Sequence, residues 1–366
     1  MTVNGPVPLE RACYHCPHCH SGLCPYDTDL GLTDDRLSPA TRPLVALAGA
    51  LAPFKQAEDV LRRPAGLRLS ASTCRRITEA AGDRLRQQQV AGVVALPGRP
   101  AAWDLSLPER DGRSFPGAVA YLGLDAFAVL TRPAKGRPLE WRMLYVGLLY
   151  DPHKQHTVYV TDLGFEVVAA RLRGYAVAFG LKGAEVLVAI TDGGNGLERV
   201  LRQNVSGALE FVLDYWHEVQ RLHKLAGLWH PADSPAAAAW VEQAKGILWE
   251  QGGEALRRHL GALRLPEGAD QELVEELRRR ISHYRDNARR ADYPNHRAKG
   301  WDVGSGPTEA GCKVVGQRVK GAGMRWLQGS SLEVAALKAL YASGLGLWEA
   351  FWTHRKPGYC PEPSQN

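Results

Sequence analysis

The sequence has no apolar run long enough to cross a lipid bilayer. Its longest continuous apolar stretch, residues 44–54, is far shorter than the roughly 20 residues of a membrane-spanning helix. The first dozen residues also lack the basic start and apolar block of a secretory signal. We therefore expect a cytoplasmic protein without a membrane partner.

Cysteine is scarce outside one short segment. Cys74, Cys312 and Cys360 are isolated. The other four lie together, at Cys13, Cys16, Cys19 and Cys24. Disulfides would need an oxidising compartment, whereas short turns can present four thiolates to one zinc ion. The cluster predicts a structural Zn²⁺ site in residues 1–35, and any of the three histidines between these cysteines is an alternative ligand.

A strong excess of either charge is also missing. The net charge is +6 and the pI is about 8.9, in a chain of 366 residues that is 45% hydrophobic and 23% charged. This composition is typical of globular proteins with two or three domains, and it permits a polyanionic partner without requiring one. Basic residues gather locally, and solvated helix faces explain part of that clustering.

Residues 36–90 have the apolar spacing of helices, interrupted at 64–69. Ser70 can cap the helix that follows, which carries Arg75 and Arg76. Two helices with basic residues on the second resemble a helix-turn-helix module, whose second helix would bind DNA through Arg75 and Arg76. An ordinary helical hairpin is the alternative.

A Pro- and Gly-rich linker, residues 91–117, precedes a change of pattern. Strands are predicted at 118–131, 139–150, 157–161, 185–192 and 208–214, with helices at 166–179 and 197–203. Short connections favour antiparallel pairing of the first three strands. This order predicts an α/β fold with an RNase H-like mixed sheet flanked by helices, whose first part covers residues 118–217.

The rest of the chain is predicted to be helical. Residues 218–300 show no strand pattern and are interpreted as an all-helical insertion. The core resumes with C-terminal helices at 301–350, and residues 351–366 form a tail.

Three acidic residues stand in informative contexts. Asp125 and Asp192 each end an apolar strand pattern, and Glu309 follows Gly306 and Pro307 at a predicted helix start. A carboxylate in an apolar strand is costly to bury unless it is paired or binds a metal. Asp192 could instead only begin a turn, and Glu309 at the third helical position could only cap its helix.

Together these three carboxylates could bind two Mg²⁺ or Mn²⁺ ions, an arrangement used for in-line chemistry on phosphodiesters. Lys313 and Lys320 follow Glu309 at helical spacing, so one helix face would carry Glu309 beside cations suited to phosphate. We therefore expect DNA or RNA strand chemistry.

Other residues near these motifs have open roles. Asp214 and His217 share a face of a helix turn, and a supporting role beside the active site is favoured over metal ligation. For Trp326, stacking on an exposed base and packing in the core are equally expected. Core packing is likewise expected for Trp216 and Trp249. Further DNA contacts are expected from Lys313, Arg318, Lys320 and Arg325.

The chain resembles bacterial insertion-sequence transposases with a DDE catalytic core, related to Mutator-like transposases. The matching motifs are Leu124-Asp125, Thr191-Asp-Gly-Gly-Asn195, Asp214-Tyr-Trp-His217, Gly304-Ser-Gly-Pro-Thr-Glu309 and Gly323-Met-Arg-Trp326. The resemblance covers about residues 118–345. It departs at Ala126, where relatives commonly have glycine.

The resemblance implies that Asp125, Asp192 and Glu309 bind the metal ions and that Asp214 and His217 are the signature pair beside them. It also implies DNA as partner, both the terminal inverted repeats and the target, a homodimer or higher oligomer, and a nucleoid-associated location. The activity would be strand cleavage and strand transfer at the ends of an insertion sequence. The alternatives are a catalytically silent DNA-binding derivative, an RNase H-like nuclease or resolvase, and a zinc-binding interaction module.

Overall fold

The computed structural model describes residues 1–32, 37–98, 102–181, 184–194, 196–205, 208–230 and 234–353. The predicted Asn195 and most of the predicted tail, including Cys360, lie outside these residues. The chain divides into two compact units. The first comprises Met1–Pro100, Ala128–Met143 and Val314–Asn366, and the second comprises Ala101–Phe127 and Leu144–Lys313.

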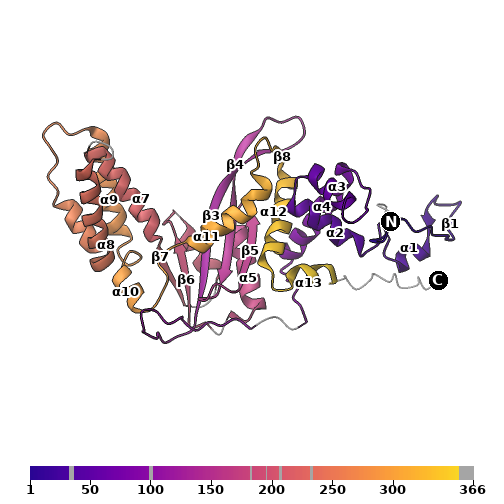
Figure 1. Ribbon diagram of the computed structural model, residues 1–366, viewed down its shortest axis with the longest axis horizontal. Coiled ribbons are helices and arrows are strands. Elements are labelled where there is room, and N and C mark those ends of the chain that lie inside the picture. Colours follow the sequence, from indigo (N-terminus) through magenta and orange to yellow (C-terminus); the bar gives the residue numbers. More distant parts are fainter. Residues whose placement is uncertain are drawn as a thin grey trace. The chain divides into compact units, whose positions relative to one another are not determined.

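A six-stranded mixed sheet is the centre of the fold (Figure 1). Its strands are β3 (Val119–Arg132), β4 (Glu140–Tyr150), β5 (Thr157–Asp162), β6 (Val186–Thr191), β7 (Leu209–Leu213) and β8 (Trp326–Leu327). The order is β5-β4-β3-β6-β7, with β8 paired to the far end of β3. β4 and β5 are antiparallel, as predicted, whereas β3, β6 and β7 run parallel.

Helices cover both faces of this sheet within the second unit. α5 (Phe165–Ala178) approaches β4 at Gly147, where a Cβ would overlap Val168. α11 (Gly306–Val319) approaches at Leu148, which touches Gly311. Because successive strand residues point to opposite faces, α5 and α11 lie on opposite sides. α6 (Leu197–Asn204) connects β6 to β7.

The helical region predicted after the last of the five strands is present, and it is called the helical insertion below. It consists of α7 (Tyr215–Trp229), α8 (Pro235–Gly261), α9 (Gln271–Asp286) and α10 (Tyr293–Ala298), which pack on one another (Figure 1). α8 bends at Gly252, whose φ of 81° is not helical. No strand lies between α7 and α11 in the described part of this region.

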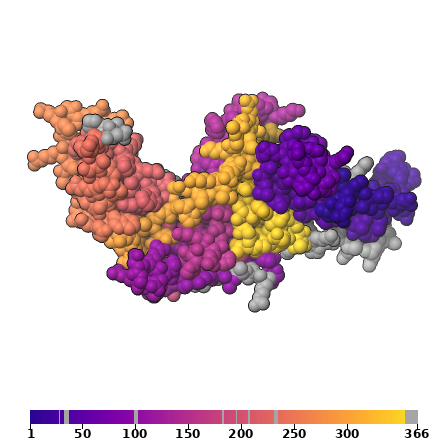
Figure 2. All heavy atoms as spheres, viewed as in Figure 1, coloured from indigo at the N-terminus to yellow at the C-terminus, as the bar shows by residue number. Residues whose placement is uncertain are grey.

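The first unit holds a separate helical cluster. α2 (Thr41–Leu51), α3 (Phe54–Arg62), α4 (Ala71–Val90) and α12 (Gln328–Ser343) pack together, and α13 (Leu347–Thr353) follows α12. Figure 2 shows the C-terminal segment in yellow against these purple helices. The Ser70 hydroxyl accepts a hydrogen bond from the amide of Thr73, which confirms the predicted cap of α4. The region has three helices rather than the two that were predicted.

The N-terminal segment is small. It contains β1 (Tyr14–His15) and β2 (Gly22–Leu23), paired antiparallel, and α1 (Pro25–Asp29). In the described part of the chain, no helix combines the length and apolar character needed to cross a membrane.

Candidate active site

Three acidic residues lie level with one another on adjacent parallel strands of the second unit. The register pairs Gly123 with Ile190 and Thr191 with Leu213. Continued along the strands, it sets Asp125 level with Asp192 and Asp192 level with Asp214. The carboxyl ends of parallel strands are where sites in α/β sheets gather. The structure therefore sets both predicted aspartates level with Asp214 on adjacent strands, Asp192 and Asp214 directly after β6 and β7 and Asp125 within the longer β3.

A glycine of β3 allows close approach of α11, the helix that carries Glu309. A Cβ at Gly123 would overlap the buried Thr308 hydroxyl, so only glycine permits the first turn of α11 to lie against β3. α11 begins at Gly306, one residue earlier than predicted. The next residue after Thr308 is Glu309, which is half-buried.

Glu309 lies with the predicted signature pair. One ligand atom from each of Asp214, His217 and Glu309 lies within 4.8 Å of the others, close enough to hold a metal ion. Asp125 and Asp192 are described and exposed, but they are not members of this group. The structure therefore gathers one predicted metal ligand with two residues for which a supporting role was favoured.

Hydrogen bonds show how Asp214 can act. Its Oδ1 accepts from the Trp216 amide at 2.8 Å, and its Oδ2 accepts from His217 Nδ1 at 2.8 Å and from the Ser305 hydroxyl. Burial alone would raise the pKa of Asp214, but these hydrogen bonds outweigh it and lower the pKa. Both oxygens already have protein partners, so Asp214 is better suited to orienting His217 than to binding a metal ion itself.

His217 lies close enough to several carboxylates for their charges to act on its imidazole. The hydrogen bond with Asp214 raises the pKa of His217, burial opposes this, and the charges of Asp214, Asp192 and Glu309 add to the increase. These carboxylates therefore stabilise the protonated form of the imidazole relative to that of a free histidine. It could donate a hydrogen bond to a phosphate oxygen.

A buried network holds the turn at Asp192. Arg221 donates from Nη2 to the Asp192 carbonyl at 2.8 Å and is paired with Glu218, which is fully buried. His283 of α9 lies 3.1 Å from the same carboxylate. Burial alone would raise the pKa of Glu218, but His283 and Arg221 lower it. Sequence reasoning missed this network because its members lie on α7 and α9, far apart in the chain.

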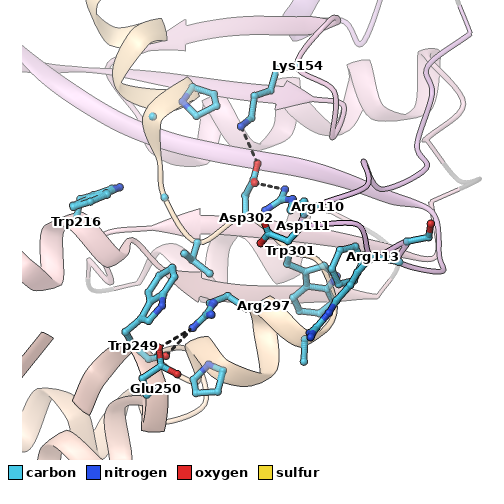
Figure 3. A pocket seen from close by; sticks show the side chains of 18 of the residues that line it. Arg110, Asp111, Arg113, Lys154, Trp216, Trp249, Glu250, Arg297, Trp301 and Asp302 are labelled. Atoms are coloured by element: carbon cyan, nitrogen blue, oxygen red, sulfur yellow. Dashed lines mark hydrogen bonds and ion pairs between the residues drawn. The ribbon is translucent and has the colours of Figure 1, made fainter. Parts of the chain in front are cut away.

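A large cavity of about 1540 Å³ opens beside Glu309 (Figure 3). Its walls include Trp216, Trp249, Arg297 and Asp302, and it is called the Trp216 cavity below. Trp216 is 60% exposed, so the prediction that it packs in the core is wrong. An aromatic between Asp214 and His217 was visible in the sequence, but its exposure was not.

No protein-family model matches this chain, and no match is found among curated proteins.

Most of the predicted DNA-contacting cations are exposed. Arg75 and Arg76 lie on the outside of α4, and Lys313, Lys320 and Arg325 are also exposed. Arg75 pairs loosely with Glu79 at 3.9 Å and lines a small cavity together with Arg325.

Arg318 was expected to contact DNA, which the structure contradicts, and Trp326 was expected either to stack on a base or to pack in the core. Arg318 is only 2% exposed, lies over the rings of Phe54 and Trp326, and donates to the Gly49 carbonyl at 2.8 Å. Burial lowers its pKa to about 10. Trp326 is buried and donates from Nε1 to the Val319 carbonyl, so of its two alternatives core packing holds.

The cysteine cluster lies in the β1–β2 hairpin region. Cys13 and Cys24 are joined by a disulfide, with Cα atoms 4.4 Å apart, and the Cys16 and Cys19 thiols are exposed. Hydrogen bonds from Ser21 and Cys16 lower the pKa of Cys19 to about 7. In this oxidised form two thiols remain, so a four-thiolate zinc site requires Cys13 and Cys24 to be reduced.

Proposed function

We propose that this chain is a DDE transposase with an RNase H-like core, which cuts and joins DNA strands at the ends of its insertion sequence. The observation that carries the proposal is the row of aspartates that the strand register sets level with one another: Asp125 within β3, Asp192 directly after β6 and Asp214 directly after β7. Glu309 is brought to His217 and Asp214 at the same site. Such a cluster of carboxylates suits divalent cations and phosphodiester chemistry.

The donor set fits Mg²⁺ or Mn²⁺. Asp125 and Asp192 are exposed carboxylates and Glu309 is half-buried, so each offers the hard oxygen ligands that such ions prefer. When bound, such ions activate water or a 3′-hydroxyl and stabilise the departing 3′-oxygen. Asp125, Asp192 and Glu309 would hold these ions.

The remaining residues position these ligands and the DNA. Asp214 orients His217, whose free nitrogen faces the reacting phosphate. Arg221 fixes the backbone at Asp192. Exposed cations on α4 and α11 would hold the DNA backbone, since phosphate contacts supply most of the affinity of such proteins. The proposed DNA partners are the terminal inverted repeats and the target, bound by a homodimer or higher oligomer because two ends must be processed together.

The test separates binding from chemistry. We expect Asp192→Asn to abolish metal-dependent cleavage of labelled inverted-repeat DNA and to leave its affinity for the same DNA unchanged. Asp286→Asn, which removes an exposed carboxylate paired with neighbouring Arg285, is the matched control and should cleave normally. Unchanged cleavage by Asp192→Asn would remove Asp192 from the site. Specific binding without cleavage in the wild type would favour a silent DNA-binding derivative, and cleavage without joining would favour a nuclease.

A structural Zn²⁺ ion on Cys13, Cys16, Cys19 and Cys24 is a further part of the proposal. Purified under reducing conditions, the chain should contain about one zinc ion per molecule, and Cys16→Ser should lose it. Cys74→Ser, which changes a buried cysteine outside the hairpin, should keep it. Metal-free wild-type protein would contradict this assignment.

A further inference from the structure

The Trp216 cavity lies directly beside the proposed site and has no role in the chemistry described so far. Glu309 lines it, and Trp216 stands between Asp214 and His217 on the first turn of α7. Trp249 on α8 and Arg297 on α10 also line it (Figure 3). A molecule in this cavity would therefore touch both the site and the insertion.

The charges of the cavity are already balanced. Among the described residues, four basic and four acidic side chains line it: Arg110, Arg113, Lys154, Arg297, Asp111, Glu250, Asp302 and Glu309. Asp302 pairs with Arg110 at 2.5 Å and with Lys154 at 3.3 Å, and Arg297 lies 3.8 Å from Glu250 (Figure 3). A channel for a phosphate backbone would carry a clear positive excess. This balance points instead to a ligand group without charge.

The aromatic side chains favour a flat ligand. Trp301 is buried at 7% exposure, and Trp249 is covered by the Arg297 guanidinium, 4.0 Å from its ring centre. Trp216, in contrast, is 60% exposed. A Cβ at Gly304 would lie 3.2 Å from Trp216, so glycine lets the α11 approach segment lie against the indole edge. Large exposed aromatic surface beside a cavity is typical of binding sites.

We propose that the Trp216 cavity holds an unpaired nucleobase adjacent to the phosphodiester that is cut, and that Trp216 stacks on this base. The inference rests on the proposed function, because it takes DNA as the substrate of the neighbouring site. A nucleobase is flat and uncharged, which fits both the exposed indole and the balanced charges. Base–aromatic stacking also tolerates any sequence, since each base has a π-face.

The test uses a fluorescent base whose emission falls when it stacks. The probe is an inverted-repeat duplex with a single-stranded flank, carrying 2-aminopurine at the first unpaired position, bound without divalent metal so that no strand is cut. Wild-type protein should quench the probe, and Trp216→Ala should restore its emission. Trp216→Phe should quench partly because a smaller ring remains. The control Trp141→Ala removes another exposed tryptophan, which does not line the cavity, and should behave as wild type.

Affinity gives a second readout. Trp216→Ala should bind the unpaired-flank DNA roughly 10-fold more weakly or worse, and a fully paired duplex nearly as well as the wild type. Quenching by Trp216→Ala equal to that of wild type would overturn the inference. So would wild-type protein that binds and cuts the DNA ends without quenching, and this result would leave the proposed function standing. Absence of any specific DNA binding would overturn the function and the inference together.

Discussion

At the scale of single residues, the Asp192 turn depends on a side chain that does not touch substrate. Arg221 combines a bond to the Asp192 carbonyl with an ion pair to the fully buried Glu218. Lysine keeps the charge next to Glu218 but lacks the planar fork that serves both partners. Arg221 is therefore a positioning residue for a proposed metal ligand.

We expect Arg221→Lys to lower cleavage at limiting Mg²⁺ by about 10-fold, as changes of residues behind metal ligands commonly do. The Mg²⁺ concentration for half-maximal cleavage should rise, with little change in the melting temperature. Arg257→Lys alters a partly exposed arginine that is likewise paired with a glutamate, Glu254, and should leave cleavage unchanged. If Arg221→Lys needs no more Mg²⁺ than wild type, the positioning role is wrong.

Glu333 is a second residue whose surroundings lead to a testable prediction, here through its pKa. Burial, followed by repulsion from Glu79 and Asp83 of α4, raises its pKa to about 7, and Arg86 opposes this increase. The folded-state pKa thus exceeds the ordinary value of 4.5. The contribution of this carboxyl group to the free energy of unfolding is therefore complete below about pH 4, where the group is protonated. It is lost as the pH rises through about 7.

Replacing Glu333 with glutamine should therefore stabilise the protein at pH 8 and change little at pH 4.5. Because the carboxyl group is partly exposed and screened by solvent, we expect a gain of only about 1 kcal/mol in the free energy of unfolding at pH 8. Urea unfolding at the two pH values measures it. Glu349→Gln, which alters an exposed glutamate of α13, is the control. An equal gain at both pH values would contradict the assignment.

At the scale of elements, close helix packing in the first unit depends on glycine. A Cβ at Gly82 of α4 would overlap the backbone carbonyl of Glu333 on α12, which cannot move without shifting the helix. Alanine in place of a helical glycine normally gains about 1 kcal/mol. At Gly82 the added methyl group would be overpacked against α12, and we expect the resulting loss in the free energy of unfolding to exceed that gain by roughly 1–3 kcal/mol.

We therefore expect Gly82→Ala to lower the free energy of unfolding and the melting temperature. Gly227→Ala on α7 is the matched control, because nothing lies within 4 Å of a Cβ at that exposed position. That variant should be as stable as wild type or slightly more so. Stabilisation by Gly82→Ala would show that α4 and α12 do not approach as described.

The elements of the sheet were largely predictable from sequence. Strands 119–132, 140–150, 157–162, 186–191 and 209–213 all end within one residue of the predicted bounds, since apolar runs bounded by Pro, Gly and Asp specify them locally. The all-helical region after β7 was also predicted. The alternation that gives a strand and the spacing that gives a helix are properties of the local chain.

Side-chain environments were less predictable because they depend on distant segments. Lys313, Arg318 and Lys320 form one basic cluster in the sequence, yet Arg318 points to a different face of α11 and is buried against aromatic rings. Nothing in the sequence around Trp216 indicates that its side chain is exposed. Ser305 and Gly123 matter only because α11 is folded back onto β3, which no local pattern reveals.

At the scale of the whole molecule, each unit is built from separate stretches of the chain. β3, β4 and α11 each contribute residues to both units. α11 contains Glu309 of the proposed site and, further along, the buried Arg318, whose contacts Phe54, Trp326 and Gly49 belong to the first unit. A single continuous helix therefore includes a proposed catalytic carboxylate and an anchor in the helical cluster.

The central claim is that Glu309 and its neighbours perform metal-dependent strand chemistry on DNA. The most direct measurement is cleavage and joining of labelled DNA that carries the inverted repeats flanking the gene, with Mg²⁺ or Mn²⁺, by wild type, Glu309→Gln and the control Glu349→Gln. We predict metal-dependent 3′-hydroxyl ends and joined products from wild type and Glu349→Gln, and neither from Glu309→Gln. Equal activity of Glu309→Gln, or wild-type cleavage that needs no metal, would contradict the account.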